Sequence, residues 1–155
     1  MIISSLGIGN SNIYRLQYFV LVIAKEVTMK VMVELDNVVF EEQVRIAQRP
    51  DTPTEVLIEF AKSKNKHLRK AAARNVSTPP EWLSKLADDE DLYIRTSAIS
   101  NSSIPVQRLR EFATDDIASI RAAVGRNPST PFEVREELKN DEELFVRRAA
   151  ESNTN

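Results

Sequence analysis

Residues 121–146 read RAAVGRNPSTPFEVREELKNDEELFV, and the three stretches before them follow the same pattern without a gap at a period of 26 residues. The four copies are Gln43 to Leu68, Arg69 to Ile94, Arg95 to Ile120 and Arg121 to Val146, followed by a partial copy from Arg147 to Asn155. A unit of this length cannot bury its own apolar face, so neighbouring units must stack to form a continuous core. The sequence therefore predicts a solenoid over residues 43–155.

Composition narrows the kind of protein. The 155 residues carry a net charge of -2 and no cysteine, and this length is typical of one domain. The lack of cysteine excludes disulfides, iron–sulfur clusters and thiolate zinc sites, and it fits a reducing compartment, so we expect a cytoplasmic protein. A slightly acidic chain argues against broad nucleic-acid binding, because that affinity comes from neutralising phosphates with Lys and Arg.

Residues 1–28 contain no copy of the repeat. Lys25 to Met29 can be encoded by codons that contain a purine-rich bacterial ribosome-binding sequence ahead of a start codon, which favours translation from Met29. The alternatives are a genuine N-terminal strand or helix and a disordered segment. The apolar run Tyr18 to Ala24 is too short to span a bilayer, so we expect no membrane insertion. Residues 29–42 are predicted to form an N-terminal cap on the first repeat.

Each copy contains a proline that we interpret as the first residue of a long helix. In three copies a threonine precedes the proline and a glutamate follows two residues later, as in Thr130, Pro131 and Glu133. This pattern indicates a capping box, in which the threonine hydroxyl accepts from a free N–H of the first turn. The third copy has Ile104 in place of threonine, so its helix is predicted to begin less securely. An apolar stripe of the first copy comprises Val56, Leu57, Phe60 and Ala61.

A second, shorter helical segment crosses each boundary between copies. One of its columns is small, which would let neighbouring backbones approach closely; it contains Ala72, Ala98, Val124 and Ala150. The segment ends at an asparagine in every copy, namely Asn75, Asn101, Asn127 and Asn153. Because asparagine tolerates the left-handed conformation, we interpret this column as a helix C-cap. The pattern does not distinguish an α-helix from a 3₁₀ stretch here.

A ladder of opposite charges runs along the copies. It contains Asp89 six residues before Arg95, Asp115 before Arg121 and Asp141 before Arg147, with Arg69 at the head of the arginine column. These carboxylates and guanidinium groups are expected to bridge adjacent repeats through charge-assisted hydrogen bonds. An active site would instead need one place with differentiated pKa values, so we interpret the ladder as structural.

The pattern of residues 120–131 and of residues 78–89 resembles the leucine-rich repeat variant family, whose repeats are similar in appearance to HEAT repeats. The resemblance covers about Gln43 to Asn155. It implies a right-handed α-solenoid with an interaction surface and an Asp and Arg ladder between repeats. One member of that family carries a cysteine-ligated iron–sulfur cluster, a property that a chain without cysteine cannot share.

Charge differs between the copies at one turn. The turn after the first long helix is basic and the equivalent turns are acidic; the basic turn and its continuation contain Lys62, Lys64, Lys66, His67, Lys70 and Arg74. A protein partner with an acidic patch could dock there, or less readily RNA, and a merely solvated run of charges is the alternative. His67 aligns with Tyr93, Ser119 and Phe145, so we predict no metal or proton-transfer role for it.

Trp82 is a second departure from the repeat pattern. Its column otherwise holds Val56, Arg108 and Val134, a mixture that predicts partial exposure. A half-exposed tryptophan beside the basic turn is a candidate anchor for a partner. Packing between helices is the alternative.

No constellation in the sequence points to catalysis, a cofactor or a metal. We therefore expect a non-catalytic protein-interaction module or scaffold, without cofactor, whose protein partner is unidentified. The polar residues of the last half-repeat predict a monomer. Two alternatives stay open: a nucleic-acid binder that uses residues 62–74, and an enzyme or accessory protein built from helical repeats.

Overall fold

The structure is a computed structural model that describes residues 36–152. The chain divides into two compact units, Met1–Glu42 and Gln43–Asn155, and the second unit contains all the predicted repeats. The expectations for residues 1–28, for Asn153 and for the first part of the predicted cap lie outside the described residues. The rest of the predicted cap, from Asp36, belongs to a helix.

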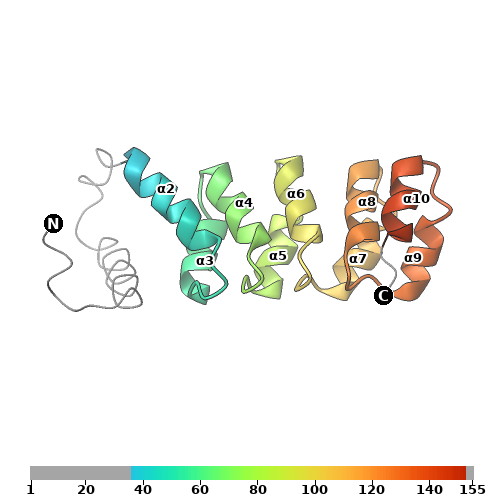
Figure 1. Cartoon of the computed structure of the whole chain (residues 1–155), viewed down its shortest axis with the longest axis horizontal. Coiled ribbons are helices and arrows are strands. Elements are labelled where there is room, and N and C mark those ends of the chain that lie inside the picture. Colours follow the sequence, from blue (N-terminus) through green and yellow to red (C-terminus); the bar gives the residue numbers. More distant parts are fainter. Residues whose placement is uncertain (1–35, 153–155) are drawn as a thin grey trace, which may run out of the picture. The chain divides into compact units, whose positions relative to one another are not determined.

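Within residues 36–152 there are nine short α-helices and no strand (Figure 1). They are α2 (Asp36–Ala47), α3 (Thr54–Ala61), α4 (Lys66–Arg74), α5 (Pro80–Leu86), α6 (Leu92–Ile99), α7 (Val106–Phe112), α8 (Ala118–Arg126), α9 (Phe132–Leu138) and α10 (Leu144–Glu151). The prediction of an all-α fold is confirmed, and the shorter segments are α-helical. In the part of the chain that the structure describes, no helix combines the length and hydrophobicity of a membrane span.

The helices of the second unit pack in sequential pairs. Each odd-numbered helix from α3 to α9 contacts the even-numbered helix that follows it, and α4, α6, α8 and α10 also contact one another in that order (Figure 1). Packing of each even-numbered helix from α4 on the next even-numbered helix is consistent with a repeat-like arrangement.

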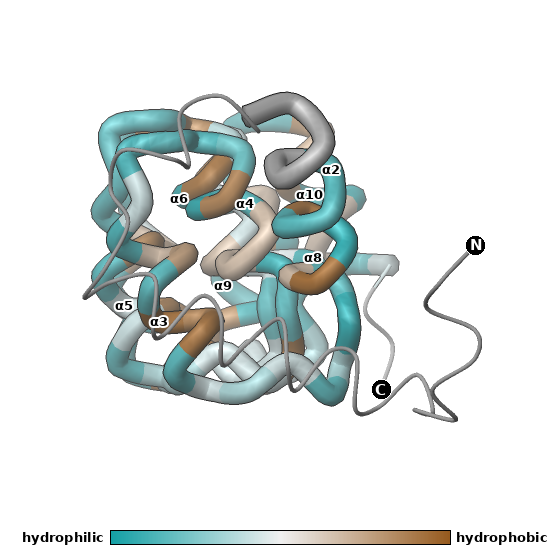
Figure 2. Tube along the Cα trace, turned by 90° about the vertical axis from the view of Figure 1, so that its left-hand side faces the viewer, coloured by the Kyte–Doolittle hydropathy of each residue, from teal (hydrophilic) through white to brown (hydrophobic). Residues whose placement is uncertain are grey.

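Equivalent apolar positions of successive repeats form the core. Leu57, Leu83 and Leu109 of the odd-numbered helices are fully buried, and Ile94 and Ile120 of the even-numbered helices are 1% exposed. Hydrophobic residues, brown in Figure 2, are carried by the helices, and hydrophilic residues predominate elsewhere along the tube. At about 25 cal/mol per Å² of buried apolar surface, these columns are the main source of stability.

The predicted role of the threonine column is wrong. The long helices begin after Pro53, Pro79 and Pro131 without a side-chain cap. Thr78 Oγ1 instead donates backwards, to the carbonyl of Ala72 at 2.6 Å, and Thr130 Oγ1 donates to Val124 at 2.6 Å. Because the even-numbered helix ends just before this threonine, its free carbonyl groups are the nearest partners for the hydroxyl.

The third repeat differs at this position. Ile104, which replaces the threonine, is 3% exposed and belongs to the core. It therefore does not weaken a cap of α7, contrary to the expectation from the sequence. Its effect is to leave the end of α6 without the hydroxyl bond that the other repeats have.

The asparagine column caps the C-terminal ends of α4 and α8 at Asn75 and Asn127, as predicted, but without the expected left-handed conformation. Asn75 has φ -75° and ψ 127°, an extended and not a left-handed conformation, and Asn127 is similar. The Nδ2 atom of Asn101 donates to the carbonyls of Ala73 at 3.0 Å and Asn75 at 2.8 Å, in the repeat before. Its Oδ1 atom accepts from the N–H of Ser103. Asn75 and Asn127 form equivalent bonds, so the column is a buried hydrogen-bond ladder between repeats.

Candidate binding surface

The charge ladder has two closed rungs. Arg69 Nε donates to Asp89 Oδ2 at 2.7 Å, and Arg121 Nε donates to Asp141 Oδ2 at 2.7 Å, each with a second bond from Nη2. Both arginines therefore form bidentate pairs with an aspartate 20 residues later, in the turn before the next even-numbered helix. The side chains of Arg121 and Asp141 are 10% and 8% exposed, so solvent screens this pair little.

Every arginine of the column, whether or not it forms a closed rung, also donates to the turn that precedes its own helix. Arg95 Nη1 donates to the carbonyls of Asp89 and Glu90, and Arg147 Nη1 donates to the carbonyls of Asp141 and Glu142. The six-residue spacing seen in the sequence therefore joins guanidinium to backbone. The pairing of side chains uses the aspartate 20 residues later.

The two closed rungs shift the pKa values of their aspartates. The hydrogen bond from Arg121 lowers the pKa of Asp141 below the ordinary value of 3.8. For Asp89, burial raises the pKa, but the hydrogen bond from Arg69, with smaller contributions, outweighs burial and the pKa is lowered. Both carboxylates are thus charged at neutral pH, as the ladder requires.

The middle rung is open. In the described residues, no ion pair joins Arg95 to Asp115, although the Asp115 carboxylate still accepts from the N–H of Ile117. The open rung lies between α6 and α8, and α8 packs more closely on α10 than on α6 (Figure 1).

A difference in side-chain size accounts for the closer packing of α8 on α10 than of α8 on α6. A Cβ atom on Gly125 of α8 would lie 3.0 Å from the backbone nitrogen of Ala150 in α10, so glycine permits a close approach. The equivalent residue of α6 is Ile99, which is fully buried and much larger. We attribute the wider step between α6 and α8 to this isoleucine.

The predicted basic residues do not form one cluster. Lys62 lies at the end of α3, 3.3 Å from Glu59, and Lys66 at the start of α4 is 3.6 Å from Asp91. Acidic neighbours therefore partly neutralise the turn. Lys64 and His67 are exposed there.

Lys70 and Arg74 lie farther along α4, toward α6. The Lys70 Nζ atom is 5.4 Å from the ring centre of Tyr93, whose side chain is 71% exposed on α6. Arg74 is the last residue of α4 and is exposed. These two residues belong to the surface of the even-numbered helices and not to the turn.

Trp82 is partly buried on α5, as its column predicted. Lys85 Nζ lies 3.9 Å from the ring centre and Lys62 Nζ lies 5.1 Å from it. Two lysines of this chain thus form cation–π contacts with the indole ring. Trp82 thus contacts lysines of α5 and of the end of α3, whereas Arg74 lies at the end of α4.

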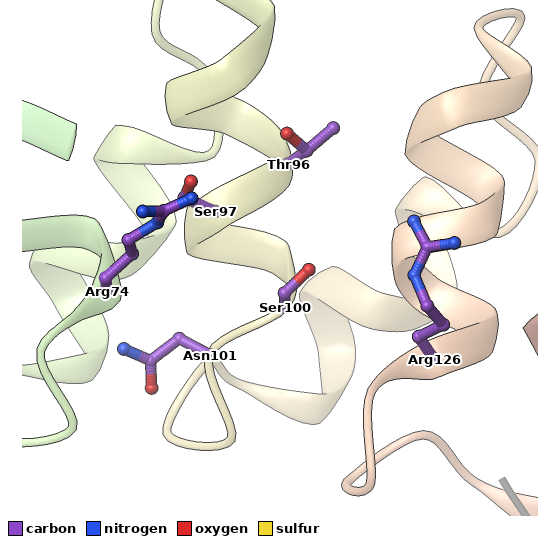
Figure 3. A pocket seen from close by; sticks show the side chains of 6 residues that line it. All are labelled: Arg74, Thr96, Ser97, Ser100, Asn101 and Arg126. Atoms are coloured by element: carbon purple, nitrogen blue, oxygen red, sulfur yellow. The ribbon is translucent and has the colours of Figure 1, made fainter.

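A polar pocket lies on the surface of α4, α6 and α8. Its volume is about 270 Å³, and it is lined by Arg74, Thr96, Ser97, Ser100, Asn101 and Arg126. Figure 3 shows Arg74 of α4 and Arg126 of α8 on either side of α6, with the hydroxyl side chains of α6 between them. The pocket coincides with the wider step of the stack.

Only some of these polar groups are available to a ligand. Asn101 uses its amide in the ladder, while Thr96 and Ser97 donate to carbonyls of the preceding turn. Within residues 36–152, neither Arg74 nor Arg126 forms an ion pair or a side-chain hydrogen bond, and Ser100 Oγ has no partner. The free donors of the pocket are therefore two guanidinium groups and one hydroxyl.

Sequence reasoning missed Arg126 and Ser100. Arg74 and Arg126 occupy the same position two repeats apart, since 126 − 74 = 52 residues, and Ser100 takes that position between them. The alternation was visible in the aligned copies. What could not be read was which arginines lack an acidic partner, because ion pairs depend on side-chain positions across repeats.

No protein-family model matches the chain. No curated protein and no solved structure matches it either. The comparisons therefore identify no family, and the exposed surface is the guide to function. In the described residues, no group of three or more His, Cys, Asp or Glu side chains could hold a metal ion.

Proposed function

We propose that this chain is a right-handed α-solenoid of repeats similar to leucine-rich repeat variants, and that it acts as a non-catalytic protein-interaction module. Its binding surface is the exposed face of α4, α6 and α8, and its partner is a protein with an acidic segment. Stacked repeats support this proposal because they expose extended surfaces that suit elongated partners. We expect the module to be monomeric and cytoplasmic.

The observation that carries the proposal is that two arginines without an acidic partner line the same pocket. Several other arginines of the second unit are engaged: Arg69 and Arg121 in the ladder, and Arg108 with Asp88 and Glu111. Arg74 and Arg126 are instead exposed beside a polar pocket. Arginine is enriched in interface hot spots, and its planar fork binds carboxylates in a bidentate manner.

The chemistry of the pocket favours binding over catalysis. General acid–base catalysis uses a group whose pKa lies near the working pH. The pocket is lined by arginine, threonine, serine and asparagine, and no histidine, aspartate, glutamate, lysine or cysteine is among its lining residues. An anion held there would be bound and would not be transformed.

The proposal is tested by affinity capture from the native host with and without nuclease, using the whole chain. The face variant is Tyr93→Ala combined with Lys70→Ala. The matched control is Phe132→Ala on α9, since that side chain is 67% exposed but lies on an odd-numbered helix.

We expect a protein partner that survives nuclease treatment, is retained by the control and is depleted with the face variant. Loss of all partners on nuclease treatment would instead favour the nucleic-acid alternative. Equal recovery with both variants would show that the face of α4, α6 and α8 is not the binding surface.

A further inference from the structure

The pocket geometry allows the partner's chemistry to be defined more closely, on the basis of the proposed function. We propose that Arg74 and Arg126 are two anion subsites of one groove, which receives an extended acidic segment of the partner. The segment runs across the C-terminal ends of α4, α6 and α8. One carboxylate-bearing side chain lies at each arginine, and Ser100 lies under the backbone between them.

The spacing of the arginines defines an extended ligand. Helices that pack together have axes about 8–10 Å apart, so residues at one position of α4 and α8 are separated by two steps, or about 16–20 Å. Figure 3 places α6 between the two arginines. At this spacing of the helices, we expect one carboxylate at each guanidinium group and not one small anion shared by both. An extended peptide rises about 3.3 Å per residue, so acidic side chains about five residues apart match the spacing.

The free donors of the pocket would bind two different groups of the peptide: the guanidinium groups bind carboxylates, and the hydroxyl binds the backbone. Each guanidinium group is a planar fork that suits a carboxylate. Ser100 is neutral and exposed, and its hydroxyl is free to donate to a backbone carbonyl of the ligand. The order of arginine, serine and arginine thus suits a peptide that is acidic at two positions and neutral between them.

Acidic residues at one end of the even-numbered helices would repel an anionic ligand that is wide enough to reach them from the arginines at the other end. They gather where the even-numbered helices begin, and comprise Asp89, Glu90, Asp91, Asp115, Asp116, Asp141, Glu142 and Glu143. Arg74 and Arg126 lie at the opposite ends, and a nine-residue helix is about 13 Å long. A nucleic-acid duplex, whose major groove alone is about 12 Å wide, would meet this acidic edge. A narrow peptide can remain on the basic edge.

Fluorescence anisotropy with synthetic peptides tests the inference on the full chain at low salt. The probe is a labelled, otherwise neutral peptide with two glutamate pairs about five residues apart. Its isomer carries the same glutamates in one block. The protein variants are Arg74→Gln, Arg126→Gln and the double variant, with Lys64→Gln as the control that removes one exposed positive charge in the turn.

We expect each arginine variant to weaken binding of the spaced peptide about tenfold, as for the loss of one charge-assisted bond. The control should bind within about twofold of the wild type, and the block isomer should bind more weakly than the spaced peptide. Circular dichroism melts check that each variant is folded.

The inference is overturned if the arginine variants bind the spaced peptide as the wild type does. It is also overturned if the block isomer binds equally well, or if a single-stranded oligonucleotide binds more tightly and displaces the peptide. Its failure differs from failure of the proposed function. A captured protein that still binds the double variant would leave the interaction module standing and remove only these subsites.

Discussion

At the scale of the residue, the buried asparagines connect each repeat to the one before it. Asn101 is 6% exposed, and its amide donates to two carbonyls while accepting one N–H. Buried polar groups of the backbone need such partners, and leaving one without a partner costs about 1–3 kcal/mol. The ladder therefore stabilises the contact between repeats in addition to the apolar columns beside it.

Replacing Asn101 with alanine should lower the free energy of unfolding by about 2–4 kcal/mol, because two carbonyls and one N–H lose their partner together. Denaturant melts measure the loss. Ser102→Ala is the control, since Ser102 is exposed and its side chain forms no hydrogen bond in the described part of the chain; we expect a change within about 0.5 kcal/mol. Equal effects of the two changes would contradict the role of the ladder.

At the scale of the element, the steps between even-numbered helices are not equivalent. The step from α8 to α10 has a glycine at the contact and a closed rung between Arg121 and Asp141. The step from α6 to α8 has Ile99 at the equivalent position and an open rung at Asp115. The pocket lies at this second step, so local sequence differences place the candidate site within a repeated fold.

The rungs can be compared by changing aspartate to asparagine. Asp115 and Asp141 both accept a backbone N–H two residues later, a bond that asparagine preserves, but Asp141 alone of the two is paired with an arginine side chain. Asp141→Asn should therefore cost about 1–3 kcal/mol, and Asp115→Asn should cost no more than about 0.5 kcal/mol. Urea melts at neutral pH distinguish the two, and equal costs would mean that the rung adds no stability.

The pH dependence of stability should reveal the same rung. The pKa of Asp141 is lower in the folded chain than its ordinary value of 3.8, so the unfolded state takes up a proton first as the pH falls. The stabilisation is complete at neutral pH, and it is lost as the pH falls from about 4 through the lowered pKa. Asp141→Asn should flatten this acid-side loss in melts between about pH 5 and 2. An unchanged slope would show that Asp141 titrates normally.

Close packing of α8 and α10 gives a further prediction. An alanine at Gly125 would place its Cβ 3.0 Å from Ala150 N and 3.3 Å from Ala149 C, both backbone atoms that move only with the helix. The expected overpacking cost of about 1–3 kcal/mol exceeds the gain in helix propensity of about 1 kcal/mol. Thermal melts should show a lower midpoint for Gly125→Ala. A higher midpoint would mean that α10 shifts without cost.

At the scale of the whole molecule, the period of the sequence repeat predicted the fold better than the residue types predicted the hydrogen bonds of individual side chains. The 26-residue repeat and its apolar columns were sufficient for an all-α fold with paired helices, because burial depends on position in the repeat. The threonine column was wrongly interpreted as an N-cap, and the asparagine column was correctly interpreted as a C-cap at Asn75 and Asn127, but its hydrogen bonds to the repeat before were not foreseen. Their partners lie on earlier segments, as Ala47 does for Asn75, and capping rules consider only the local chain.

The candidate site was predicted only in part for the same reason. Arg74 was named from the sequence, but as a member of a basic turn, and Arg126 was not named. Acidic neighbours such as Glu59 and Asp91 partly neutralise the turn, whereas the guanidinium groups at the pocket remain free. A count of charges along the chain does not distinguish these two situations.

We propose that the chain binds an acidic protein segment at the pocket lined by α4, α6 and α8. Amide chemical-shift mapping of the full isotope-labelled chain with the spaced acidic peptide locates the binding surface residue by residue. We predict that the shifts centre on Arg74, residues 96–101 and Arg126, and that they disappear in the double variant Arg74→Gln and Arg126→Gln. Shifts centred instead on Lys62, Lys64 and Trp82, or no shifts at saturating peptide, would contradict the account.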